Sequence, residues 1–145
     1  MEKNHKKYPQ TRLKDHPEWI TNEVNGDTII WAESFAEYLS EGGKQAMTTS
    51  QIRNFFGELK RIQAGYNNYK NRIPMLKVQL AYSAGRQWDK EKKSYKTKVD
   101  KFNEELKTGI DLIIKAEENN KKNYFKNFVS LCEAIVAYHK FHGAD

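Results

Sequence analysis

The chain has 145 residues and a formal net charge of +6, because 25 Lys or Arg outnumber 19 Asp or Glu. This length suits one domain, and a hydrophobic content of 38% excludes a wholly disordered chain. No apolar run approaches the roughly 20 residues that span a bilayer, and the positive charge points to nucleic acid before a membrane surface, so we expect no membrane among the partners. The single cysteine, Cys132, cannot form an internal disulfide, which favours a reducing compartment and a cytoplasmic protein.

The beginning of the chain has neither helical nor strand periodicity, and Pro9 and Pro17 interrupt it. We expect residues 1–26 to form an irregular N-terminal arm, with Trp19 docked on the rest of the protein. Residues 27–145 are helical in pattern throughout, and we expect them to form one helical bundle domain.

The first part of this domain predicts two helices. Asp27 is the expected cap of the first helix, which ends at a Gly-Gly pair. Thr48 and Gln51 have the spacing of a capping box at the start of the second helix. The apolar stripe of the second helix consists of Ile52, Phe55, Phe56, Leu59, Ile62 and Tyr66.

Pro74 predicts the first turn of a third helix, where its missing N–H would be unpaired in any case. This helix is apolar on two opposite faces, which is typical of a helix at the centre of a bundle or covered by another subunit. One face holds Ile73, Leu76, Leu80 and Ala84, and the other holds Met75, Val78 and Tyr82.

A fourth helix over residues 91–118 and a last helix over about 120–143 complete the pattern, and no stretch alternates like a strand. We expect Glu104 and Glu105 to lie on a solvated face of the fourth helix. The predicted fold is all-α, a single compact bundle of about five helices with an irregular N-terminal arm.

The positive charge is concentrated in the middle of the sequence. Residues 44–93 hold eleven Lys or Arg and three Asp or Glu, a net charge of +8 that exceeds the +6 of the whole chain. Helical spacing places Arg53 and Lys60 on one ridge of the second helix, with Arg61 and Asn54 beside it. Such a ridge is either a solvated face or a site for phosphates, and the scarcity of nearby acidic residues favours RNA or DNA.

The third helix complicates this surface. Lys77 and Arg86 fall on nearly opposite faces, so both cannot join one flat surface with the second helix. Either one of them serves a protein interface, or a nucleic acid passes over an edge of the bundle. The alternative function is a helical interaction module whose basic face binds an acidic protein partner.

The last helix gives little support to catalysis. His139 and His142 have a spacing that can hold a metal ion, but only Cys132 lies near as a third ligand. We expect His139 and Cys132 to pack in the apolar stripe, with no metal and no cofactor. A P-loop and the GxGxxG, GxSxG and HExxH motifs do not occur in the sequence, so we do not expect an enzyme. A small metal-dependent nuclease using the two histidines is the enzymatic alternative.

The chain contains MTTSQIRNFF at residues 47–56, RIPMLKVQLAYSAGR at residues 72–86 and EAIVAYHKFHG at residues 133–143. In this order and approximate spacing, the segments resemble the small helical subunit of type III-A CRISPR–Cas effector complexes, from about residue 44 onward. The resemblance implies a non-catalytic subunit whose copies stack along guide RNA and target RNA. It also implies contacts with the other subunits of the complex, in antiviral defence.

The resemblance places basic or polar character at Arg53, Asn54, Lys77, Gln79 and Arg86, whereas Lys60 and Arg61 depend on the helical-face pattern alone. In this family the last segment tends to be aromatic where this chain has His139 and His142, which agrees with the packing interpretation. The residues expected to contact RNA are Arg53, Asn54, Lys60, Arg61, Lys77 and Arg86.

Overall fold

Five long helices form the body of the protein in a computed structural model that describes residues 6–143. They are α2 (Gly26–Ser40), α3 (Thr49–Ala64), α5 (Ile73–Gly85), α6 (Val99–Lys115) and α7 (Glu118–Phe141). The short elements are η1 (Leu13–Asp15), α1 (Glu18–Thr21), η2 (Gly43–Gln45), α4 (Tyr66–Tyr69), η3 (Lys70–Arg72), β1 (Trp88–Asp89) and β2 (Ser94–Tyr95). The predicted all-α bundle is therefore confirmed.

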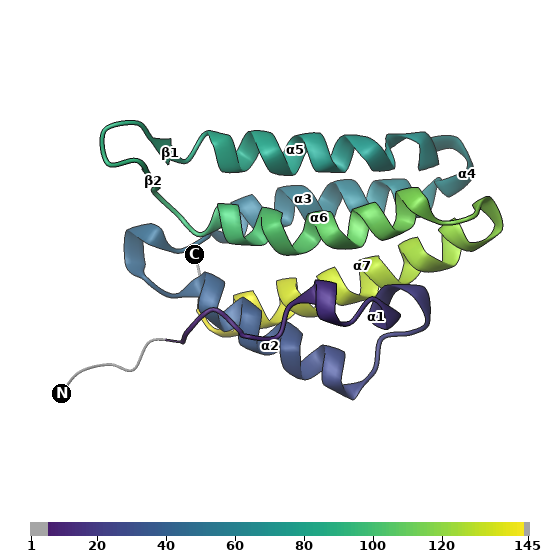
Figure 1. Cartoon of the computed structure of the whole chain (residues 1–145), viewed down its shortest axis with the longest axis horizontal. Helices are drawn as coiled ribbons and strands as arrows, with labels where there is room; N and C mark the ends of the chain where they lie inside the picture. Colours follow the sequence, from purple (N-terminus) through teal and green to yellow (C-terminus); the bar gives the residue numbers. More distant parts are fainter. Residues whose placement is uncertain (1–5, 144–145) are drawn as a thin grey trace.

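The helices are arranged in layers around α7. Helix α5 is the outer layer above α3 and α6, and α7 lies beneath them, with α2 and the N-terminal segment on the far side (Figure 1). Helix α7 packs against α1, α2, α3 and α6. Its buried stripe, which fills the centre of the bundle, consists of Phe125, Phe128, Val129, Leu131, Cys132, Ile135 and His139.

Of the three helix starts predicted from a capping residue or a proline, two are correct. The capping box of Thr48 and Gln51 is present, with each backbone N–H bound to the other side chain, and Pro74 lies in the first turn of α5. The predicted cap Asp27 is wrong, because Asn25 caps α2. The Asn25 side chain accepts a hydrogen bond from the backbone N–H of Thr28 at 3.1 Å, so the helix begins two residues before the predicted start.

The second helix ends before Tyr66, the last residue of its predicted apolar stripe. Helix α3 ends at Ala64, and Gly65 interrupts it with φ −124° and ψ 46°, so Tyr66 begins the separate turn α4. Tyr66 nevertheless packs on the core, with its ring centre 5.9 Å from that of Phe125.

The fourth helix begins later than predicted, because residues 88–95 form a β-hairpin. Strands β1 and β2 pair antiparallel, with Trp88 opposite Tyr95. The turn is fixed by the Asp89 carboxylate, which accepts hydrogen bonds from the backbone N–H groups of Glu91 and Lys92. Lys93 then takes a left-handed φ of 53°. A side chain that binds its own backbone in this way competes with helix formation, so α6 starts at Val99.

The N-terminal arm is docked rather than loose. Leu13, Trp19 and Ile20 are buried in the same core as the long helices. The ring of Trp19 lies 5.8 Å from that of Trp31 on α2, which confirms the predicted docking of Trp19.

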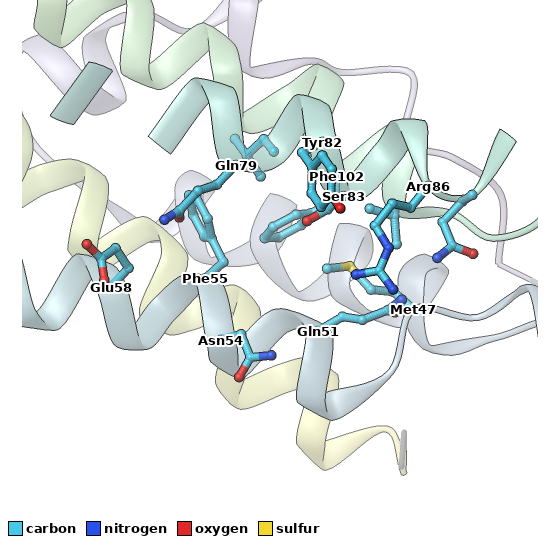
Figure 2. A pocket seen from close by; sticks show the side chains of 13 residues that line it. Met47, Gln51, Asn54, Phe55, Glu58, Gln79, Tyr82, Ser83, Arg86 and Phe102 are labelled. Atoms are coloured by element: carbon cyan, nitrogen blue, oxygen red, sulfur yellow. The ribbon is translucent and has the colours of Figure 1, made fainter. Parts of the chain in front are cut away.

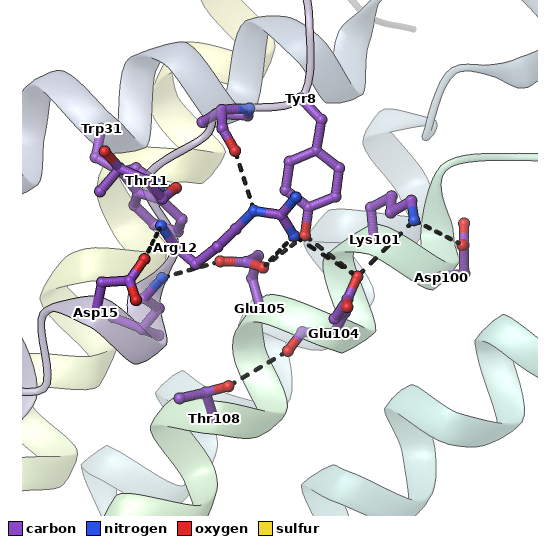
Figure 3. Close-up of polar contacts among 12 residues, drawn as sticks. Tyr8, Thr11, Arg12, Asp15, Trp31, Asp100, Lys101, Glu104, Glu105 and Thr108 are labelled. Carbon is purple, nitrogen blue, oxygen red and sulfur yellow. Dashed lines mark hydrogen bonds and ion pairs between the residues drawn. The ribbon is translucent and has the colours of Figure 1, made fainter.

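Glu105 holds the arm against α6, so the expectation that it is solvated is wrong. This buried carboxylate accepts a hydrogen bond from the backbone N–H of Leu13 at 3.0 Å and another from the hydroxyl of Tyr8 (Figure 3). The guanidinium of Arg12 lies 3.7 Å away. Burial and the hydrogen bond to Glu105 raise the pKa of Tyr8 above its ordinary value. Neighbouring Glu104 stays exposed, as expected.

Gly109 allows α6 to approach α7 closely. A Cβ atom at this position would lie 2.6 Å from two ring carbons of Phe128, a distance that real Cβ contacts do not show. Phe128 is fully buried and has no room to move aside. Gly57 on α3 is the opposite case, since a Cβ there would meet nothing within 4 Å.

We predict that Gly109→Ala lowers the free energy of unfolding by about 1–3 kcal/mol through overpacking, although alanine is the better helix former. Gly57→Ala is the matched control and is expected to raise the free energy of unfolding by about 0.5–1 kcal/mol. Urea denaturation of the two variants measures both values. Equal stabilisation by both substitutions would show that the close approach of α6 to α7 does not constrain residue 109.

Candidate nucleic-acid interface

Part of the positive charge of residues 44–93 is neutralised within the protein. Glu58 forms ion pairs with Arg61 at 3.5 Å and with Arg72 at 3.2 Å. The guanidinium of Arg61 remains largely exposed beside this pair. A partly neutralised cation attracts an external phosphate less strongly than an unpaired one, so Arg61 is a weaker candidate than its position on α3 suggested.

Acidic residues from outside residues 44–93 neutralise two more cations. The ammonium of Lys77 donates to the Asp111 carboxylate on α6 at 2.6 Å, and Lys70 pairs with Glu118 at 3.0 Å. Lys77 therefore lies on the α6 side of α5. The hydrogen bond from Lys70 lowers the pKa of Glu118 below its usual range. Counting charges along the sequence could not detect these partners, because they are 34 and 48 residues away.

The basic ridge of α3 keeps its unpaired charges. We define it as Arg53, Gly57, Lys60 and Ala64, all of which are exposed. Neither cation forms an ion pair with any of residues 6–143. The ammonium of Lys60 donates a hydrogen bond to the side-chain amide oxygen of Gln63 at 3.1 Å and lies over the ring of Phe56, 6.0 Å from its centre. The small residues between the two cations leave room for a phosphate backbone to lie along the ridge.

A groove of about 450 Å³ lies between α3 and α5. Asn54 of α3 and Arg86, the residue that follows α5, are two of its lining residues (Figure 2). Arg86 has no ion pair with any described residue, and its guanidinium carbon lies 5.8 Å from the ring centre of Tyr82. Of the six predicted contacts, Arg53 and Lys60 lie on the ridge, Asn54 and Arg86 in the groove, and Arg61 and Lys77 in internal ion pairs.

The β-hairpin is a further basic element, and none of the RNA contacts expected from the sequence lies on it. It projects beyond the end of α5 (Figure 1). Its exposed cations are Lys90, Lys92, Lys93 and Lys96. Trp88 and Tyr95 are exposed on it as an edge-to-face pair with ring centres 5.0 Å apart. Two aromatic residues flanking an Asp-initiated basic turn are a hairpin signal that could have been recognised from the sequence.

The last helix provides structural contacts rather than free ligands. His139 is buried, and its Nε2 lies 2.7 Å from the carbonyl oxygen of Met47, which can only accept, so Nε2 donates. Cys132 is buried beside it, and burial raises the pKa of its thiol well above the ordinary value. The predicted packing of both residues is confirmed. His142 instead lies 3.5 Å from Glu33. Within residues 6–143, no group of three or more His, Cys, Asp or Glu could hold a metal ion.

Together these features define a small, mainly helical protein with unpaired cations on an exposed face of α3. The family model for Csm2 Type III-A matches residues 23–145. The chain therefore belongs to this family, a small subunit of type III-A CRISPR–Cas complexes, and the resemblance seen in the sequence is confirmed. The match begins some twenty residues before the resemblance noted in the sequence. No curated protein and no solved structure matches the chain. None of the helices formed by residues 6–143 has both the length and the apolarity required to cross a membrane.

His139 makes stability sensitive to pH. Burial lowers the pKa of His139, since protonation would place a second, unpaired N–H in the core. The unfolded chain takes up this proton near pH 6.5, whereas the folded chain resists it, so stability falls as the pH drops below that value. We predict that the urea midpoint of the protein falls between about pH 7.5 and 5.5, and that His139→Gln shows a smaller fall.

His16→Gln is the comparison variant, because His16 is partly exposed and pairs with exposed Glu18 at 2.8 Å. Since ion pairs between exposed groups contribute little to stability, this variant should keep most of the pH dependence of the unmodified protein. An identical fall in the His139→Gln variant would show that other groups cause the pH dependence.

Proposed function

We propose that the chain is a non-catalytic, RNA-binding small subunit of a type III-A CRISPR ribonucleoprotein. Through a basic face it lines the duplex of guide RNA and target RNA, and it stacks with further copies of itself in antiviral defence. Membership of the Csm2 family supports the place in the complex. The pair of unpaired, exposed cations on the basic ridge is the observation that supports RNA binding.

The ridge chemistry suits RNA recognised through its backbone. Arg53 offers a planar fork for phosphate oxygens, and Lys60 offers a mobile point charge two helical turns further along. Contacts of this kind carry no sequence information, which a guide-based complex does not need, because base pairing with the guide RNA supplies it. Arg86 and the hairpin lysines extend the positive surface past the end of α5.

We predict weak, salt-sensitive binding of single-stranded RNA by the isolated protein, measured by fluorescence anisotropy over a salt series. Arg53→Ala/Lys60→Ala should weaken binding and reduce the slope of log affinity against log salt by about 1.4, because each lost phosphate contact contributes roughly 0.7. Lys14→Ala/Lys140→Ala is the matched control, since it removes the same charge from exposed positions outside residues 44–93.

The two double variants separate a local site from general attraction. Equal weakening by both would assign the effect to net charge, and an affinity that ignores both salt and charge removal would contradict the proposal. Pull-down from a nuclease-treated lysate tests the alternative, because an acidic protein partner survives nuclease treatment and an RNA-bridged assembly does not.

Self-stacking is supported by the outer position of α5. One face of this helix is buried against the bundle, but Met75, Val78 and Tyr82 on the other face are 52%, 54% and 67% exposed. Helix α5 is the outer layer and not central in the bundle (Figure 1), and residues 6–143 leave its second apolar face exposed. Contacts between a surface of this kind and a different surface of the next copy generate open stacks.

We predict that Met75→Glu/Val78→Glu lowers the number of small-subunit copies in the reconstituted complex, because two carboxylates would have to be buried at each contact. Native mass spectrometry of the complex counts the copies. Ile30→Glu is the control, since Ile30 is 70% exposed and belongs to α2, which lies on the far side of α7 from α5. Full incorporation of the double variant would exclude this face as the contact.

A further inference from the structure

The groove between α3 and α5 has an apolar floor and a polar rim. Phe55 and Phe102 are buried at its base. Its volume of about 450 Å³ lies within the range of small-molecule sites. In Figure 2, Gln79 and Ser83 of α5 and Arg86 just after it reach toward the groove, and Asn54 borders it from α3. A flat aromatic ring with polar groups at its edge fits such a surface, because the face of the ring packs on the apolar floor while the polar groups can form hydrogen bonds with the rim.

The rim offers unused hydrogen-bonding groups. The side chains of Asn54, Gln79 and Ser83 make no hydrogen bond with any of residues 6–143, and none of them is buried. Each amide presents both a donor and an acceptor, and the hydroxyl can act as either. This mixed set complements the edge of a heterocyclic base, which carries donors and acceptors side by side.

The few charges around the groove argue against an acidic peptide or a run of phosphates as its occupant. Arg86 is its single cation, and Glu58 lies among the lining residues as a single anion held by two arginines. An acidic peptide or a run of phosphates would require more cations than this, and an apolar helix would bury the amides without partners. A nucleotide with one base and one phosphate suits this groove, because its single negative charge can pair with the guanidinium of Arg86. The exposed ring of Tyr82 lies beside that guanidinium and offers a surface on which a base can stack.

We propose that this groove binds one unpaired nucleobase of RNA, with the adjoining phosphate on Arg86 and the base edge on the amides of Asn54 and Gln79. The inference rests on the proposed RNA binding and goes beyond it, because the basic ridge reads only the backbone whereas the groove reads a base. The ridge and the groove are neighbours on α3, so one strand can occupy both.

The experiment compares single-stranded RNA with an oligomer of the same length whose internal positions are abasic. Fluorescence anisotropy measures the affinity of the full chain for each probe at fixed salt. The unmodified protein should bind the base-containing probe about tenfold more tightly, as expected for one stacked base. Gln79→Ala/Ser83→Ala should reduce this ratio several-fold while the affinity for the abasic probe stays unchanged.

Two further variants keep the outcomes distinct. Asn67→Ala/Asn68→Ala removes exposed amides from α4, at the other end of α5, and should leave the ratio intact. Arg53→Ala/Lys60→Ala should weaken binding of both probes equally and also leave the ratio intact. If the groove variant keeps the full ratio, the groove is not the base site, although RNA binding stands. If neither probe binds at low salt, the proposed function and this inference both fail.

Discussion

The close approach of α6 to α7 at Gly109 is the constraint on which the rest of the structure depends. Phe128 fills the space that any side chain at position 109 would need, and Leu13 of the arm closes over the same point with its Cδ2 atom 3.5 Å from the Cβ position. Three segments that are far apart in the sequence therefore meet at one residue without a side chain. Glycine weakens a helix by about 1 kcal/mol, and the tight packing here offsets that cost.

Helix α6, which packs closely on α7 at Gly109, packs against α5 on its other side. Lys77 and Asp111 join the two helices, and the buried stripe of α5 covers the layer that α3 and α6 form. The groove exists because α5 sits above this layer instead of within it, which leaves Phe55 and Phe102 at the bottom of an open space. His139 adds a second fixed point by holding the carbonyl of Met47 just before α3 begins. The basic ridge thus lies on a helix that is held at its start.

Local patterns in the sequence were enough to predict the helical bundle, the capping box at Thr48 and the burial of His139, because an apolar stripe and a capping box are set by residues three or four positions apart. They missed two other side chains that bind the nearby backbone, Asn25 at the start of α2 and Asp89 in the hairpin. They also failed where partners are distant. Glu105 looked solvated beside Glu104, and Lys77 looked unpaired, because Leu13 and Asp111 come close to them only after folding.

Tyr82 belongs to two surfaces at once. Its ring is part of the exposed apolar face of α5 and also borders the groove that Asn54 and Arg86 line. A neighbouring copy that covers this face and a base that enters the groove would therefore touch the same side chain. Two ligands that share a contact cannot bind independently, and the coupling between them is reciprocal. Loading of RNA and recruitment of the next copy would then be thermodynamically linked, so that each sets the affinity of the other.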